Sequence, residues 1–113
     1  MTISNFQTLT GRAPVFQDAE VGRLANDIIV LRYGKSCDPA SVPATSDFSV
    51  AGTVQTITTV TFINNEVRLT MSLALLNTDV LTVSYTKGVN PLKDTSQNES
   101  SNLVTESVVN NIP

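Results

Sequence analysis

The sequence contains no histidine, no tryptophan and only one cysteine among its 113 residues. The absence of histidine removes the commonest general base and the commonest transition-metal ligand, so an enzyme built on this chain would have to work with carboxylates alone. The single cysteine, Cys37, cannot form an intrachain disulfide, and we interpret it as a small buried side chain. These absences favour a non-catalytic protein without a cofactor.

Charge is also sparse, because Asp, Glu, Lys and Arg make up 15% of the chain and the net charge is −3. The seven basic residues are scattered singly, unlike the clustered Lys and Arg that bind nucleic acid. No apolar run approaches the roughly 20 residues that span a bilayer. The N-terminal segment lacks the pattern of a signal peptide, so any export signal would lie on a longer parent chain. We expect no nucleic-acid partner and no membrane insertion.

Alternation of apolar and polar residues is the main pattern that the sequence does contain. It is clearest over residues 67–73, which predicts a half-buried strand. The apolar positions that we expect on its inner face are Val67, Leu69, Met71 and Leu73.

A β-hairpin is predicted over residues 54–73. Its turn is Asn64-Asn65, because asparagine tolerates the positive φ of tight hairpin turns. In its first strand Ile57 and Val60 cannot both face inward with regular alternation. We therefore predict a bulge near Thr58-Thr59.

Four further segments have the composition of strands, namely residues 14–21, 28–33, 80–85 and 103–109. In the second and third, the positions predicted to face the core are Ile29, Leu31, Tyr33, Leu81, Val83 and Tyr85. Asp18 and Glu20 share one face of the first segment. We interpret that segment as a solvated edge strand, since acids on an edge discourage aggregation.

The fold class predicted from this pattern is all-β. No segment shows sustained helical periodicity, and about seven short strands in roughly 100 residues are typical of an antiparallel, immunoglobulin-like β-sandwich. The domain would cover residues 13–113. Residues 1–12 would be a linker or N-terminal extension, with Thr8-Leu9-Thr10 adding a short edge pairing.

One short helical crossover is predicted over the stretch DPASVPATSDFSV, residues 38–50. Asp38 is a good N-cap, Pro39 suits the first helical position, and Pro43 ends the helix after about one turn. We expect Val42 and Phe48 to fill the end of the core, with Asp47 facing water.

Five separated motifs resemble those of the SWM or SwmB-type repeat, a family of repeats in bacterial surface proteins and phage-associated surface chains. The matching stretches are IVLRY at 29–33, DPASVPA at 38–44, TVSY at 82–85, NPLKD at 90–94 and VVNN at 108–111. Many members carry acidic residues in the segment before DPAS and after TVSYT, where this chain has Lys35 and Lys87.

This resemblance implies a non-catalytic structural or adhesive repeat module of a bacterial cell-surface protein, extracellular in location. Its partners would be neighbouring repeats of the same chain or other surface molecules, and it would be a monomer or a weak edge-strand dimer. One alternative is a phage virion-associated decoration or tail domain. Another is a carbohydrate-binding module, for which Phe6 and Phe16 are the aromatics free to be exposed.

The polar loop over residues 90–100 contains the candidate metal ligands. Asp94, Asn98 and Glu99 offer oxygen donors of the kind that calcium binds, although the loop also contains Lys93 and no glycine. The alternative is that these side chains cap backbone turns. Asp18 and Glu20 are the other acid pair, but no polar pocket for hydrolysis is visible around them.

Overall fold

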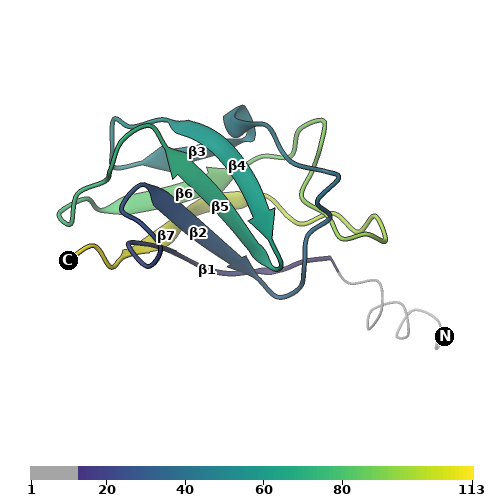
Figure 1. Cartoon of the computed structure of the whole chain (residues 1–113). Coiled ribbons are helices and arrows are strands. Elements are labelled where there is room, and N and C mark those ends of the chain that lie inside the picture. The colour runs from purple at the N-terminus through teal and green to yellow at the C-terminus, as the bar shows by residue number, and fades with distance from the viewer. Residues whose placement is uncertain (1–12) are drawn as a thin grey trace.

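The structure is a computed structural model that describes residues 13–113 and contains seven strands and one short 3-10 helix (Figure 1). The elements are β1 (Phe16–Val21), β2 (Ile28–Tyr33), η1 (Thr45–Asp47), β3 (Phe48–Ala51), β4 (Ile57–Ile63), β5 (Glu66–Met71), β6 (Leu81–Tyr85) and β7 (Leu103–Asn110). The all-β prediction is confirmed. The predicted linker at residues 1–12, with Thr8-Leu9-Thr10, lies outside the described residues.

The seven strands form one continuous sheet in the order β3-β6-β7-β1-β2-β5-β4. The sheet curls until its two edge strands, β3 and β4, lie close together without joining in the described chain. All neighbours are antiparallel except β1 and β7, which are parallel. The immunoglobulin-like sandwich is therefore not confirmed, since the strands form a mixed, nearly closed barrel.

The core lies inside this curl. The positions predicted to face inward on β2 and β6 are all buried, as are three of the four on β5. Leu73 was predicted incorrectly: β5 ends at Met71, and Leu73 is 66% exposed in the loop that follows.

The predicted hairpin is confirmed as β4 and β5. Ile63 pairs with Glu66 across the two-asparagine turn, and Asn64 has a φ of 55°. The pairing shifts between Ile57 and Thr59, so Thr58 is the extra residue of the predicted bulge.

The crossover differs from the prediction in the position of its helix. Asp38 does cap a turn, because its Oδ1 accepts a hydrogen bond from Ala40 N at 2.9 Å, but no helix follows it there. The helical turn is η1, after Pro43, where Asp47 Oδ2 accepts a hydrogen bond from Ala44 N at 3.3 Å.

The end of the crossover leads directly into β3, a four-residue strand that the sequence patterns did not predict. Phe48 is buried as expected and packs on Tyr85 with ring centroids 4.9 Å apart. Val42 is 38% exposed and does not fill the core, contrary to the prediction. Asp47 is only partly exposed because it closes the η1 turn.

The strands run between two ends of the molecule, visible in Figure 1 at the right and the left. We call the first the motif end; it contains residues 34–47, 64–65 and 86–102. The second, the far end, contains residues 22–27, 72–80 and 111–113. The chain enters β1 from the motif end and leaves β7 at the far end.

The far end holds the last residues of the chain in place. Asn111 N donates to Val21 O at 2.8 Å, and Asn110 Nδ2 donates to Leu76 O and Asp79 O at 2.9 Å each. Gly22 has a φ of 99°, and a Cβ there would lie 2.6 Å from the Asn111 backbone. Only glycine therefore permits this close approach.

Candidate functional site

Three of the five motifs, DPASVPA, TVSY and NPLKD, come together at the motif end. The Tyr85 hydroxyl accepts a hydrogen bond from Leu92 N at 2.8 Å, and Leu92 itself is fully buried. The DPAS turn bonds to the same loop, since Asp38 N donates to Lys93 O at 2.6 Å and Ser41 Oγ to Pro91 O at 2.7 Å. The crossover and the NPLKD loop are thus fixed to one another and to β6.

Asp94 is the most densely bonded side chain of this assembly. It is 3% exposed; its Oδ2 lies 2.8 Å from Lys35 Nζ, and its Oδ1 accepts from Ser96 N and Asn98 N at 2.9 Å each. Burial alone would raise the pKa of Asp94, but the hydrogen bonds from Lys35, Asn98 and Ser96 outweigh it and hold the pKa well below the ordinary value. The carboxylate therefore stays charged and organises the loop.

The other two candidate calcium ligands, Asn98 and Glu99, also contact protein groups of this loop and its neighbours. The Asn98 side-chain amide donates to both Asp94 oxygens, at 3.0 and 3.2 Å. Glu99 Oε1 lies 3.5 Å from Lys87 Nζ, and the Glu99 side chain is 49% exposed. Residues 13–113 contain no group of three or more His, Cys, Asp and Glu side chains that could hold a metal. Calcium binding by Asp94, Asn98 and Glu99 stays a prediction.

The two lysines that depart from the family pattern face the acids of this loop. Lys35 is paired with Asp94, 59 positions further along the chain, and Lys87 is paired with Glu99. An ammonium group thus lies where a cation bound to either carboxylate would be expected. The sequence signal was the pair of lysines at usually acidic positions, but their partners could not be read from it.

Asp18 and Glu20 lie on the outer face of the sheet, but the interpretation of their segment as an edge strand was wrong. β1 lies between β7 and β2, and both acids contact Arg32 of β2. Arg23 joins Glu20 to Glu66 of β5. Including the Arg68–Glu66 pair at 2.9 Å, the outer-face network therefore consists of Asp18, Glu20, Arg23, Arg32, Glu66 and Arg68.

This network covers an apolar residue. Val30 is fully buried but is not part of the core cluster. Its neighbours Ile29 and Leu31 face the core, so the Val30 side chain lies on the outer face of the sheet. Burial alone would raise the pKa of Glu66, but the hydrogen bond from Arg68 and the charges of Arg23 and Arg32 lower it. The acids are therefore partners in a charged layer.

The aromatic side chains do not form a flat platform in the described part of the chain. Phe16 is partly buried and meets Tyr33 edge-on, with centroids 5.8 Å apart and an interplanar angle of 75°. Phe6 lies outside the described residues. Cys37 is buried as predicted, at 4% exposure.

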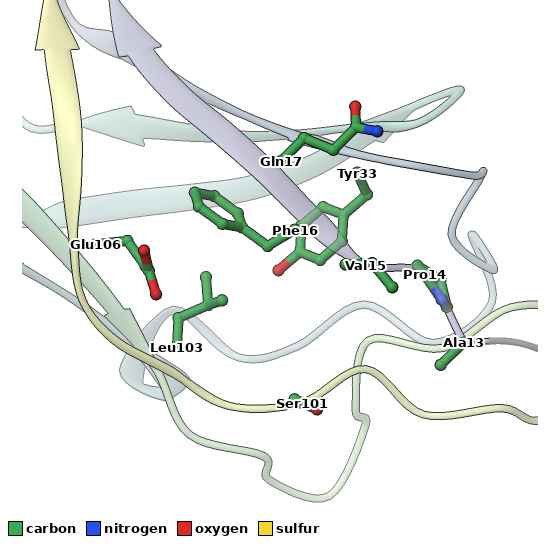
Figure 2. Close-up of a pocket in the computed structure, with 9 residues that line it drawn as sticks. All are labelled: Ala13, Pro14, Val15, Phe16, Gln17, Tyr33, Ser101, Leu103 and Glu106. Carbon is green, nitrogen blue, oxygen red and sulfur yellow. The ribbon is translucent and has the colours of Figure 1, made fainter.

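Sequence reasoning missed one polar group that the structure places in a cavity. Tyr33 was assigned to the core, and its side chain is fully buried. Its hydroxyl, however, has no hydrogen-bond partner among residues 13–113 and faces a cavity beside Phe16 (Figure 2). Alternation indicates that a residue is buried, but it does not indicate whether a hydroxyl group finds a partner.

Comparison with protein families agrees with the motifs. The family model of the SWM repeat, described as a putative flagellar system-associated repeat, matches residues 10–90, more than two thirds of the chain. No curated protein and no solved structure matches the chain. The described residues include no helix that is long and apolar enough to cross a membrane. Through the match over residues 10–90, which contains the motifs at 29–33, 38–44 and 82–85, the chain belongs to the SWM repeat family.

Proposed function

We propose that this chain is a non-catalytic spacer unit, which acts in a string of similar units on a bacterial cell surface. The observation that carries the proposal is the path of the chain, which enters at the motif end and leaves at the far end (Figure 1). Units with this path, joined in series, add their lengths. Membership of a repeat family supports the same arrangement.

The arrangement of the terminal strands suits a unit that carries tension. β1 and β7 are parallel neighbours, so force applied at the two ends of the chain pulls them past each other along their axes. The hydrogen bonds that join β1 to β2 and β7 to β6 are also loaded along the strand axes. Hydrogen bonds loaded together in this way resist more force than bonds that open one after another.

Both points of attachment are also held by hydrogen bonds outside the strands. Before β1, Pro14 O accepts a bond of 2.7 Å from the buried Ser100 Oγ. At the end of β7, the Asn110 side chain bonds to Leu76 O in a far-end loop, and Asn111 N bonds to Val21 O, the last residue of β1. Tension would therefore reach the sheet without first pulling out a loose end.

Force spectroscopy on three joined copies of the whole chain tests this proposal. Pulling through the two termini should open each unit in one step and release roughly 300 to 360 Å of extended chain for about 100 residues. The control attaches one handle at Asn64, in the motif-end hairpin turn, and one at the N-terminus, so that strands peel apart sequentially. The control should open at clearly lower force. Equal forces in both geometries would contradict the proposal.

A parent gene that encodes several tandem copies would support the string, and the partners would then be the neighbouring repeats. Adhesion to a further surface partner would need an exposed face on one of those copies. The outer-face network and the threonines of β4 are the polar faces that the unit offers.

A further inference from the structure

A cavity separates β1 from β7 at the motif end. Within the described residues these strands pair only through Glu20 with Val109 and Val21 with Asn110, close to the far end. Towards the motif end they diverge around a cavity of about 420 Å³ (Figure 2). Its walls include Pro14, Phe16, Tyr33, Leu103 and Glu106.

Bulges in both strands maintain this separation. The β1–β2 register shifts between Phe16 and Asp18, and the β6–β7 register shifts between Val83 and Tyr85. The second bulge contains Thr105 at a φ of 45°, a conformation that is costly for a β-branched residue. Bulges and strained residues of this kind are frequent beside binding sites.

The Tyr33 hydroxyl is the polar feature of the cavity. Figure 2 shows it directed towards the space between Phe16 and Leu103. A buried hydroxyl without a partner is unfavourable, because it has given up its hydrogen bonds to water without replacing them. Burial, and then the charges of Cys37, Tyr85 and Glu106, raise the pKa of Tyr33, so the phenol stays protonated and can donate a hydrogen bond.

We propose that this cavity binds a compact, uncharged apolar molecule that carries one hydrogen-bond acceptor oxygen. The acceptor would meet the Tyr33 hydroxyl, and the apolar body would lie against Phe16 and Leu103. Glu106 is the only charged side chain lining the cavity in the described part of the chain, so it disfavours anions. The proposal is independent of the spacer function, since neither strand pairing nor chain path depends on it.

Titration of the full chain followed by two-dimensional NMR tests the site with three probes. Benzyl alcohol supplies the apolar body and the acceptor, toluene lacks the acceptor, and phenylacetate adds a negative charge. Benzyl alcohol should give saturable shifts around Phe16, Tyr33 and Leu103, and phenylacetate should bind at least several-fold more weakly. Tyr33→Phe should weaken benzyl alcohol roughly 2- to 10-fold and leave toluene unchanged, as expected for one net hydrogen bond.

Substitutions at exposed serines supply the matched controls. Ser101→Phe places a large side chain at the rim and should abolish binding, whereas Ser107→Phe on β7, outside the cavity lining, should not affect it. Unchanged peak dispersion would show that each variant folds. The proposal is overturned if benzyl alcohol gives no saturable shifts, which would mean that the cavity holds only water. It is also overturned if benzyl alcohol binds Ser101→Phe as well as the native chain, or if phenylacetate binds as tightly.

Discussion

At the scale of single residues, buried polar groups in this protein differ in whether they have partners. Asp94 accepts hydrogen bonds from a lysine, two backbone amides and an asparagine side chain. The Tyr85 hydroxyl has one backbone partner, and the Tyr33 hydroxyl has none among the described residues. The stability effects of removing these groups should follow the same order.

Replacing the Asp94 carboxylate should be costly. Asp94→Asn removes the charge that pairs with Lys35 in a site where the side chain is 4% exposed. We expect the free energy of unfolding to fall by about 1–3 kcal/mol, measured by urea denaturation. The control Glu99→Gln changes an exposed acid 3.5 Å from Lys87 and should stay within about 0.5 kcal/mol. Equal effects would contradict the assigned role of Asp94.

The same variant should change the pH dependence of stability. The folded pKa of Asp94 lies below its ordinary value of 3.8, so its contribution is present above that value and is lost as the pH falls towards the folded pKa. The stability difference between the native chain and Asp94→Asn should therefore narrow below about pH 4. A difference that stays constant down to acid unfolding would contradict this linkage.

The two tyrosines provide a matched pair of substitutions. Tyr85→Phe leaves the buried Leu92 amide without its acceptor and should cost about 1–2 kcal/mol. Tyr33→Phe removes an unpartnered hydroxyl and should leave stability unchanged or raise it by up to about 1 kcal/mol. Thermal unfolding of both variants checks the prediction, and a larger loss for Tyr33→Phe would reverse it.

At the scale of strands, the outer-face network joins β1, β2 and β5 through charges. Arg32 of β2 joins the two acids of β1, because it contacts the carboxylates of both Asp18 and Glu20. The Glu20 side chain is only 12% exposed. If Arg32 were removed, little water could take its place beside the Glu20 carboxylate. The network therefore adds a charged layer over Val30 on the side of the sheet opposite the core.

Replacing Arg32 should weaken this layer in a salt-dependent way. Arg32→Met keeps much of the apolar stem and should lower the free energy of unfolding by about 1–2 kcal/mol at low salt. The difference in free energy of unfolding between Arg32→Met and the native chain should shrink in 1 M NaCl, where the screening length is about 3 Å. Lys87→Met, at an exposed pair, should cost less than about 0.5 kcal/mol. An unchanged difference at high salt would contradict an electrostatic role.

Six of the seven strands could be located from the sequence, and β3 could not. β5 was located by its regular alternation, β4 as its hairpin partner, and β1, β2, β6 and β7 by their strand-like composition. The Thr58 bulge was inferred from a break in alternation within β4. β3 was missed because its four residues follow directly on a proline-containing turn. The interior position of β1 depends on β7, about 90 residues further along, and a local pattern cannot report such a pairing.

The candidate site was predictable in composition but not in its contacts. Asp94 and Asn98 were selected as oxygen donors, and the structure does bring these two together. The contact with Lys35 spans 59 positions, and the Asn98 amide is turned so that it donates to Asp94. Which atoms face each other is decided by how the crossover packs on the loop.

At the scale of the whole molecule, stability should not depend on calcium. The Asp94 oxygens already accept hydrogen bonds from protein donors, and Glu99 faces an ammonium group. A ligand that binds only the folded state would raise the melting temperature. We expect little or no shift between millimolar calcium and a chelator, measured by calorimetry. A clear rise that Asp94→Asn abolishes would instead establish a calcium site.

The single thiol makes the opening of the molecule measurable without introducing a new cysteine. Cys37 is 4% exposed, and burial, followed by the charge of Asp94, raises the pKa of its thiol to about 11. Since only the thiolate of an accessible cysteine reacts, iodoacetamide should modify the chain at a rate proportional to the fraction of molecules in which Cys37 is exposed by unfolding. Tyr85→Phe should be alkylated faster by about tenfold for each 1.4 kcal/mol of lost stability. Alkylation of Cys37 thus reports the fraction of time for which this unit is open.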